Sequence, residues 1–177
     1  KPAIVCILGT GSNSCYFDGT SVHMKTVSLG YSVMDEASGN YFGKLLLREY
    51  FYGKMPKRIA NKFEEEYNLD ADVIKYHLYK QPNPNAYLAS FAEFMFLNKE
   101  SKYISNLIKT GITIFTKNMI YQFKDVLPNV PVHFAGSIAF FSQPEIKEVA
   151  KELDFTVGNF ERRPIEGLLK YHVKNLN

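Results

Sequence analysis

Six consecutive apolar residues, Ala3–Leu8, stand almost at the start of the chain and end at Gly9. A short apolar run that is rich in β-branched side chains and is stopped by glycine is typical of a strand buried on both faces. Such a strand lies inside a sheet and not at its edge. The chain has 177 residues, of which 46% are apolar, enough for one domain with a substantial core. We therefore expect one domain built around this strand.

A hairpin is predicted directly after the first strand. Asp18 and Gly19 separate two extended runs, residues 13–17 and 21–29. An Asp-Gly pair between two such runs favours a tight turn, because both turn positions must accept a positive φ. The chain is therefore expected to open with three consecutive strands, the third over residues 21–29.

Helical periodicity begins near residue 37. The expected helices cover residues 37–53, 56–67, 71–79, 86–97, 101–124, 142–153 and 165–173, and further strands are expected over residues 131–135 and 155–160. Asp70 is expected as an N-cap, Ser142 with Glu145 as a capping box, and residues 81–85 as a loop because of their two prolines. Strands followed by alternating strands and helices predict an α/β domain, with a mixed five-stranded sheet flanked by helices.

Charge and composition exclude several classes of function. Lys and Arg total 21 against 18 Asp and Glu, a net charge of +3, which is too even for a protein whose main partner is nucleic acid. The two cysteines have no CxxC spacing and the four histidines are scattered, so neither a metal site nor a disulfide framework is predicted. No apolar run approaches the roughly 20 residues that a membrane span needs. We expect no membrane partner and a cytoplasmic setting.

A glycine-rich segment follows the first strand. It consists of Gly9, Thr10, Gly11, Ser12 and Asn13. Two glycines let a backbone approach a ligand closely, and the amides and hydroxyls of such a segment can bind phosphate oxygens. The alternative is a tight turn without a ligand. The segment is not a Walker loop, since no Gly-Lys-Ser/Thr follows and the next element is a strand.

Two carboxylates precede the first expected helix. Asp35 and Glu36 either stabilise the start of that helix by capping and through its dipole, or accept hydrogen bonds from the hydroxyls of a sugar or other polyol. In the second interpretation Gly30 leaves room for the ligand.

Small residues mark the end of a later strand. Gly136, Ser137 and Ile138 either allow close packing of the next helix or form the floor of an adenosine site. Arg162 and Arg163 are expected to be solvated surface charges.

These segments, in this order, resemble one family. They are residues 7–13, the Asp18-Gly19 turn, and residues 30–38, 135–139 and 163–169. They resemble the C-terminal domain of N-acetylglucosamine kinases and of the related BadF/BadG-type ATPases, within the actin, hexokinase and Hsp70 ATPase superfamily. The resemblance spans essentially the whole chain. It implies that residues 1–177 are a single ribonuclease-H-like (actin-like ATPase) domain, the C-terminal domain of a two-domain sugar kinase.

The resemblance also implies where ligands bind. ATP with Mg²⁺ and a sugar, N-acetylglucosamine or a related N-acetylhexosamine, lie between two domains in this family. Residues 9–13 match its second phosphate motif and residues 136–138 its adenosine motif, while Gly30, Asp35 and Glu36 fall where the kinases contact the sugar. The first phosphate motif and the general base lie in the first domain. No catalytic residue is therefore expected in this chain, which begins with Lys1 and is expected to lack that domain.

Some positions depart from the family pattern. Ser28, Met34 and Ala37 stand where glycine is common in the kinases, which leaves the identity of the sugar open. A BadF-type ATPase that activates a partner enzyme through a shared iron-sulfur cluster is an alternative, although Cys6 in a buried strand and Cys15 in a hairpin argue against it. A non-catalytic sugar-sensing domain is another alternative. The expected partners are the sugar, ATP and the first domain, and a homodimer stays open.

Overall fold

The apolar run at the start of the chain forms the central strand of the sheet, β1 (Ala3–Leu8), in the computed structural model. It pairs antiparallel with β2 (Ser12–Phe17) and parallel with β4 (Val132–Ala135). β3 (Val22–His23) flanks β2, and β5 (Val157–Glu161) flanks β4, so the strand order is β3-β2-β1-β4-β5. The predicted mixed five-stranded sheet, with three antiparallel strands first, is confirmed.

The third strand is much shorter than the predicted residues 21–29. Only the two residues of β3 pair with β2. The side-chain oxygen of Asn13 accepts a hydrogen bond from the Ser14 N–H at 2.8 Å, which occupies an amide that a longer third strand would need for pairing. Residues 24–29 consequently form an irregular and mostly exposed segment.

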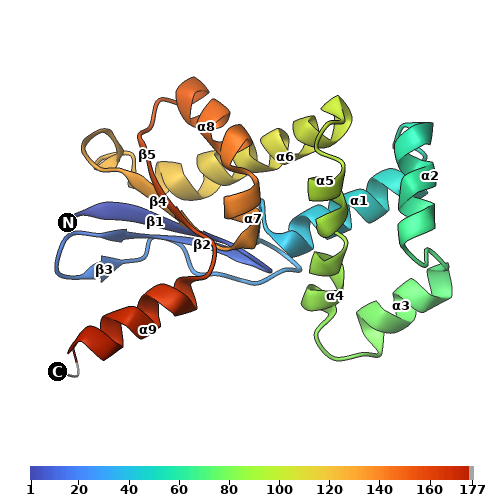
Figure 1. The fold of residues 1–177 in the computed structure, drawn as a ribbon, viewed down its shortest axis with the longest axis horizontal. Helices are drawn as coiled ribbons and strands as arrows, with labels where there is room; N and C mark the ends of the chain where they lie inside the picture. Colours follow the sequence, from blue (N-terminus) through green and yellow to red (C-terminus); the bar gives the residue numbers. More distant parts are fainter. Residues whose placement is uncertain (176–177) are drawn as a thin grey trace.

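The structure describes residues 1–175, with helices on both faces of the sheet. The α-helices are α1 (Gly39–Phe51), α2 (Lys57–Glu66), α3 (Ala71–Tyr79), α4 (Pro84–Ser90), α5 (Glu93–Leu97), α6 (Lys102–Phe115), α7 (Ser137–Phe141), α8 (Gln143–Glu152) and α9 (Pro164–Asn175). Figure 1 shows α6 and α8 along one face and α9 on the other, while α1 to α5 extend beyond the end of the sheet. Among residues 1–175, no helix combines the length and the apolar character that crossing a membrane requires.

Two expected helices are divided. The stretch 86–97 forms α4 and α5. The stretch 101–124 forms α6, then the π-helical η1 (Thr116–Ile120) and the 3₁₀ turn η2 (Tyr121–Phe123); another 3₁₀ turn, η3, covers Leu127–Asn129. The hydroxyl of Thr116 donates to the Ile112 carbonyl at 2.9 Å, and such bonds within a helix weaken its regular pattern. The expected loop 81–85 is also shortened, because α4 already begins at Pro84.

The expected capping box at Ser142 and Glu145 does not form. Ser142 ends α7 as well as preceding α8, and its hydroxyl has no hydrogen-bond partner in the described part of the chain. The buried Glu145 carboxylate instead pairs with Lys99 Nζ at 3.1 Å, and Lys99 also donates to the Phe141 carbonyl at 2.7 Å. Asp70, by contrast, caps α3 as predicted, since its carboxylate accepts two backbone amides.

The core lies between the sheet and the helices on its α6 side. Ile4, Cys6 and Leu8 alternate along β1 and are fully buried, whereas Ile7, on the opposite face, is 51% exposed. Large side chains of the helices, among them Phe42, Phe63, Phe94 and Phe115, and Phe91 from the turn between α4 and α5 fill the rest of the core. The end of β1 is therefore held rigidly, and the glycine-rich segment continues directly from it.

Candidate functional site

The N-terminus of α1 holds the segment that follows β1. We call residues 9–12 the glycine turn. The Gly39 N–H donates to the Gly9 carbonyl at 2.7 Å, and the Asn40 N–H donates to the Thr10 carbonyl at 3.1 Å. The first amides of a helix have no acceptor within the helix and are free for such contacts. Two successive carbonyls of the glycine turn therefore face α1.

The amides of the glycine turn consequently face the other way. All described peptide bonds are trans, and a trans peptide directs its N–H opposite to its C=O. The N–H groups of Thr10 and Gly11 therefore point away from α1, and neither has an acceptor within residues 1–175. Successive free amides on one side of a turn bind phosphate oxygens, and the positive end of the α1 dipole behind them favours an anion.

Asp35 connects the glycine turn to α1. Its carboxylate is buried, with Oδ1 accepting from the Ser12 N–H at 3.3 Å and Oδ2 accepting from Asn40 Nδ2 at 3.0 Å. The N-cap of α1 is Ser38, whose hydroxyl oxygen accepts the Tyr41 N–H at 3.2 Å. Asp35 is therefore not the cap of this helix; it positions the turn.

Asn40 is a site residue that no sequence pattern indicated. Its side chain is 1% exposed, and Nδ2 donates to the Thr10 carbonyl at 2.7 Å as well as to Asp35. Its Oδ1 is buried without a partner in the described residues. Residues 10 and 40 meet only because α1 returns to the end of β1, so neither composition nor spacing signals the contact.

Position 11 requires glycine because a larger side chain would collide with Asp35. A Cβ on Gly11 would lie 2.9 Å from Asp35 Oδ2, and Gly11 is not among the glycines with positive φ. A Cβ on Gly9 would meet nothing within 4 Å. The two glycines of the turn therefore differ in how much they constrain the sequence.

Gly30 and Glu36 flank Asp35 in the segment before α1. Gly30 has a φ of +78°, and its carbonyl accepts the Met34 N–H at 2.8 Å. Glu36 is half-buried and accepts one long hydrogen bond, 3.3 Å, from Asn118 Nδ2. Of the two predicted sugar-binding carboxylates, Glu36 is thus the one with more unused hydrogen-bonding capacity.

Lys44 of α1 fastens this segment. Its ammonium group donates to the Tyr31 carbonyl. Burial lowers the pKa of Lys44, and the nearby carboxylates of Asp35 and Glu36 partly oppose that shift. A lysine of α1 therefore lies close enough to Asp35 and Glu36 to interact electrostatically with both carboxylates.

Gly136 packs directly on the end of β1. It has a φ of +108°, and a Cβ there would lie 2.4 Å from the Leu8 carbonyl oxygen and 3.2 Å from Gly9 N. Its N–H donates to the Glu161 carbonyl at 2.9 Å. Parallel β1 and β4 end at the same edge of the sheet, which is where α/β folds bind ligands. The fold thus brings the two predicted nucleotide segments together.

A groove begins beside the glycine turn. It has a volume of about 430 Å³ and lies between α7 and the α4–α5 pair, which stand next to each other in Figure 1. Its lining is Ala89, Ala92, Glu93, Phe96, Leu97, Ser137, Ile138, Phe141 and Arg162. A Cβ on Gly39 would lie 2.9 Å from the Cβ of Ala89, and Gly39 itself binds the Gly9 carbonyl. One end of the groove is therefore adjacent to the turn.

Two predicted residues occupy different surroundings from those expected. The side chain of Asn13 is engaged within β2 by the bond to Ser14 described above. Arg162 is exposed as expected, but it is not only solvated, because its guanidinium lies 4.9 Å from the centre of the Phe141 ring. The aromatic partner is 21 residues away in sequence, so no local pattern indicated it.

The cysteines are both free thiols. Cys6 is fully buried and Cys15 is partly buried, and burial raises the pKa of each thiol. In the described part of the chain, no three His, Cys, Asp or Glu side chains lie close enough to hold a metal ion.

Two solved structures share this fold. A protein from Porphyromonas gingivalis, named as a candidate N-acetylglucosamine kinase, superimposes on the whole chain with a TM-score of 0.90 and 34% sequence identity. A protein from Chromobacterium violaceum with the same name matches 90% of the chain with a TM-score of 0.65 and 14% identity, which shows a common fold alone. The chain spans 62% and 55% of the lengths of these two proteins. No family model and no curated protein sequence matches it.

Proposed function

We propose that this chain is the C-terminal, ribonuclease-H-like domain of a cytoplasmic, ATP-dependent sugar kinase of the BadF/BadG type. The observation that carries the proposal is the pair of free amides at Thr10 and Gly11, beside a groove lined by Ser137 and Ile138. The likeness to the P. gingivalis protein, at 34% identity, supports the same function. The sugar we propose is N-acetylglucosamine or a related N-acetylhexosamine.

The nucleotide would lie across the edge of the sheet. Its phosphates would accept hydrogen bonds from the amides of the glycine turn, and its adenosine would pass Gly136 into the groove. Mg²⁺ would be bound chiefly by the phosphates, because both oxygens of Asp35, the buried carboxylate beside the turn, already accept hydrogen bonds. When bound, the ion would neutralise charge on the transferred group.

The sugar would lie on the side of Gly30 and Glu36. Glu36 has the capacity to accept a hydrogen bond from a sugar hydroxyl, while Asp35 would hold the phosphate turn and the sugar segment in register. A sugar hydroxyl would attack the γ-phosphorus, with ADP as the leaving group. Phosphoryl transfer depends on in-line positioning and charge stabilisation, so we propose that a preceding domain supplies the general base and the first phosphate motif.

The proposal is tested by phosphate transfer in the full-length protein. We expect label from γ-³²P-ATP to appear on N-acetylglucosamine, and we expect Gly11→Val to abolish the transfer while Lys109→Ala, far from the turn, leaves it intact. The 177-residue chain alone should show no turnover, since one wall of a cleft cannot align the nucleophile. Absence of transfer to any N-acetylhexosamine by the folded full-length protein would contradict the proposal.

A further inference from the structure

Arg162 lies at the groove beside α7 and has no acidic partner in the described part of the chain. Arg162 follows β5, and its guanidinium carbon lies 4.9 Å from the centre of the Phe141 ring and 6.0 Å from that of Phe140. Within residues 1–175 it forms no ion pair or hydrogen bond. The planar guanidinium and its five donors are therefore available to a ligand in the groove.

The aromatic support of this guanidinium is itself fixed. Phe141 packs against Phe96 with ring centres 5.3 Å apart. The Phe141 carbonyl accepts a hydrogen bond from Lys99 at 2.7 Å, and Lys99 is anchored by the buried Glu145 carboxylate. The wall of the groove that carries Arg162 is thus built before any ligand enters.

The position of Arg162 alongside α7 decides whether it would contact the phosphates or the base of a nucleotide in the groove. Gly136 lies against the glycine turn, whereas Phe141 is five residues further along the helical segment, about 7 Å at the rise of an α-helix. The Arg162 backbone begins beside Gly136, because the Glu161 carbonyl accepts the Gly136 N–H at 2.9 Å, and its side chain reaches the Phe140 and Phe141 rings at the C-terminal end of α7. That end would receive the base of a nucleotide whose phosphates bind the turn.

We infer that Arg162 is a nucleobase-binding residue whose guanidinium plane stacks on the base, with Phe141 supporting it from the other side. This inference rests on the proposed nucleotide site. Stacking on a guanidinium needs only the π-face that every base has. Arg162 therefore strengthens the binding of adenine and guanine nucleotides alike and leaves their discrimination to other groups.

The test compares three probes by calorimetry on the full-length protein: ADP, GDP and inorganic tripolyphosphate. Arg162→Ala should weaken ADP and GDP each by about tenfold, the range of a cation–π or base-stacking contact, and leave tripolyphosphate binding unchanged. Arg162→Lys should lose nearly as much, because lysine keeps the charge but not the plane. Lys147→Ala is the matched control, since Lys147 forms a cation–π pair with Phe160 and does not line the groove; it should bind all three probes like the parent.

Each other outcome is decisive. Equal ADP affinity in the folded Arg162→Ala variant, full affinity in Arg162→Lys, or a parallel loss of tripolyphosphate would overturn the stacking role. If the parent protein binds neither ADP nor tripolyphosphate, the proposed nucleotide site itself is wrong and the inference falls with it. Circular dichroism melts of the variants establish that each is folded.

Discussion

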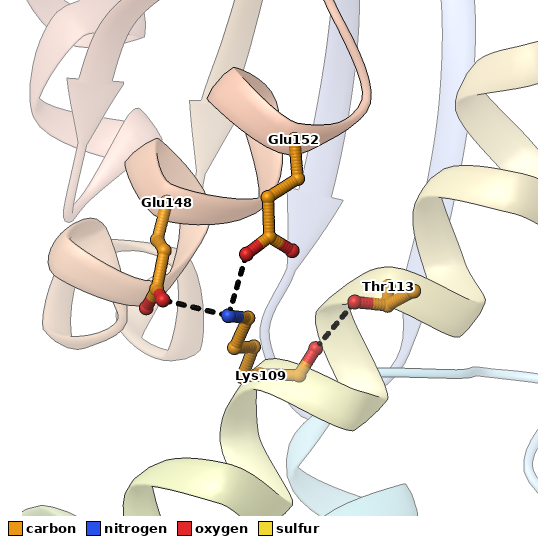
Figure 2. A network of polar contacts seen from close by, with 4 residues as sticks. All are labelled: Lys109, Thr113, Glu148 and Glu152. Carbon is orange, nitrogen blue, oxygen red and sulfur yellow. Dashed lines mark hydrogen bonds and ion pairs between the residues drawn. The ribbon is translucent and has the colours of Figure 1, made fainter.

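Two polar networks in this molecule use similar groups in different surroundings. The first joins α6 to α8, where Lys109 Nζ lies 2.6 Å from Glu148 and 2.7 Å from Glu152 (Figure 2). The two glutamates are 55% and 52% exposed, and the hydrogen bonds they accept raise the pKa of Lys109. Solvent screens such charges, and pairs of this kind contribute about 0 to 1 kcal/mol.

The second network joins the glycine turn to α1. Asp35 and Asn40 are 8% and 1% exposed, and they satisfy the Ser12 amide and the Thr10 carbonyl. A buried group that loses its partner costs about 1 to 3 kcal/mol, because no water replaces the lost bond.

The difference shows where the sequence is constrained by structure. In the surface network each partner is a long side chain that can find solvent, so any member is replaceable. In the buried network each member fixes a backbone group of the proposed phosphate turn. The bonds of the two networks overlap in length, from 2.6 to 2.7 Å on the surface and from 2.7 to 3.3 Å in the buried network, so burial and not bond length decides which network determines the geometry of the site.

Gly11→Ala should break the buried network most severely. The added Cβ would lie 2.9 Å from Asp35 Oδ2 and displace the carboxylate. We expect a loss of about 2 to 3 kcal/mol in the free energy of unfolding, measured by urea denaturation. Gly9→Ala is the matched control, since its Cβ meets nothing within 4 Å, and it should be neutral or slightly stabilising. Equal losses in both variants would remove Asp35 from the explanation.

Asp35→Asn should have the second largest effect. The substitution keeps the size of the side chain but can place an NH₂ group against the Ser12 amide or the Asn40 side chain, both of which donate. We expect a loss of about 1 to 3 kcal/mol in stability and a weakening of ATP binding of similar size, because the glycine turn loses its support; the affinity for the sugar, measured by calorimetry like that for ATP, should fall less. Glu36→Gln, at the half-buried neighbour that accepts one long hydrogen bond, should keep the parent's stability but weaken the binding of the sugar. Denaturant titrations and calorimetry with N-acetylglucosamine check both variants.

Ser38→Ala should have a smaller effect. The Ser38 hydroxyl oxygen accepts the Tyr41 N–H at 3.2 Å and caps α1, and loss of such a cap costs about 1 kcal/mol. The melting temperature should fall, because the helix that orients the glycine turn begins less firmly. A melting temperature unchanged from the parent would show that Gly39 and Asn40 hold the start of α1 without the cap.

Lys109→Ala should have the smallest effect. We expect a loss below about 1 kcal/mol that shrinks further as salt is raised, because the partners are exposed. The measurement is urea denaturation at low and high salt. A loss as large as that of Asp35→Asn would erase the contrast between the two networks.

Much of the fold was predictable because its signals are local. The apolar run Ala3–Leu8 and the hairpin at Asp18-Gly19 are confirmed, but residues 18–21 form the connection and, of the Asp-Gly pair, Gly19 alone has a positive φ, so the predicted two-residue turn is wrong. The Asp18 carboxylate even closes its own turn by accepting from the Thr20 and Ser21 amides. The predicted length of the third strand was wrong. The Asn13 side chain in the neighbouring strand occupies the Ser14 amide, and nothing in residues 21–29 themselves indicates that contact.

The residues of the candidate site likewise fall into those that a local sequence pattern indicates and those that it does not. Gly11 and Gly136 could be singled out because glycines after strands are visible in the sequence. Asn40 and Arg162 could not, because Asn40 acts on a carbonyl 30 residues earlier and Arg162 rests on a ring 21 residues earlier. The Ser142 capping box failed for a similar reason, since Glu145 is bound by the distant Lys99. The ligand roles of all these residues stay predictions.

Amide chemical shifts of the ¹⁵N-labelled protein test the central claim, that the glycine turn binds phosphate, most directly. On titration with MgADP, the Thr10 and Gly11 resonances should move downfield as their N–H groups gain acceptors, and the amides of Gly136, Ser137 and Ile138 should also respond. Adenosine should shift residues 136–138 and leave Thr10 and Gly11 in place. If MgADP binds and shifts residues 136–138 while Thr10 and Gly11 keep their free positions, the phosphates lie elsewhere and the account of the turn is contradicted.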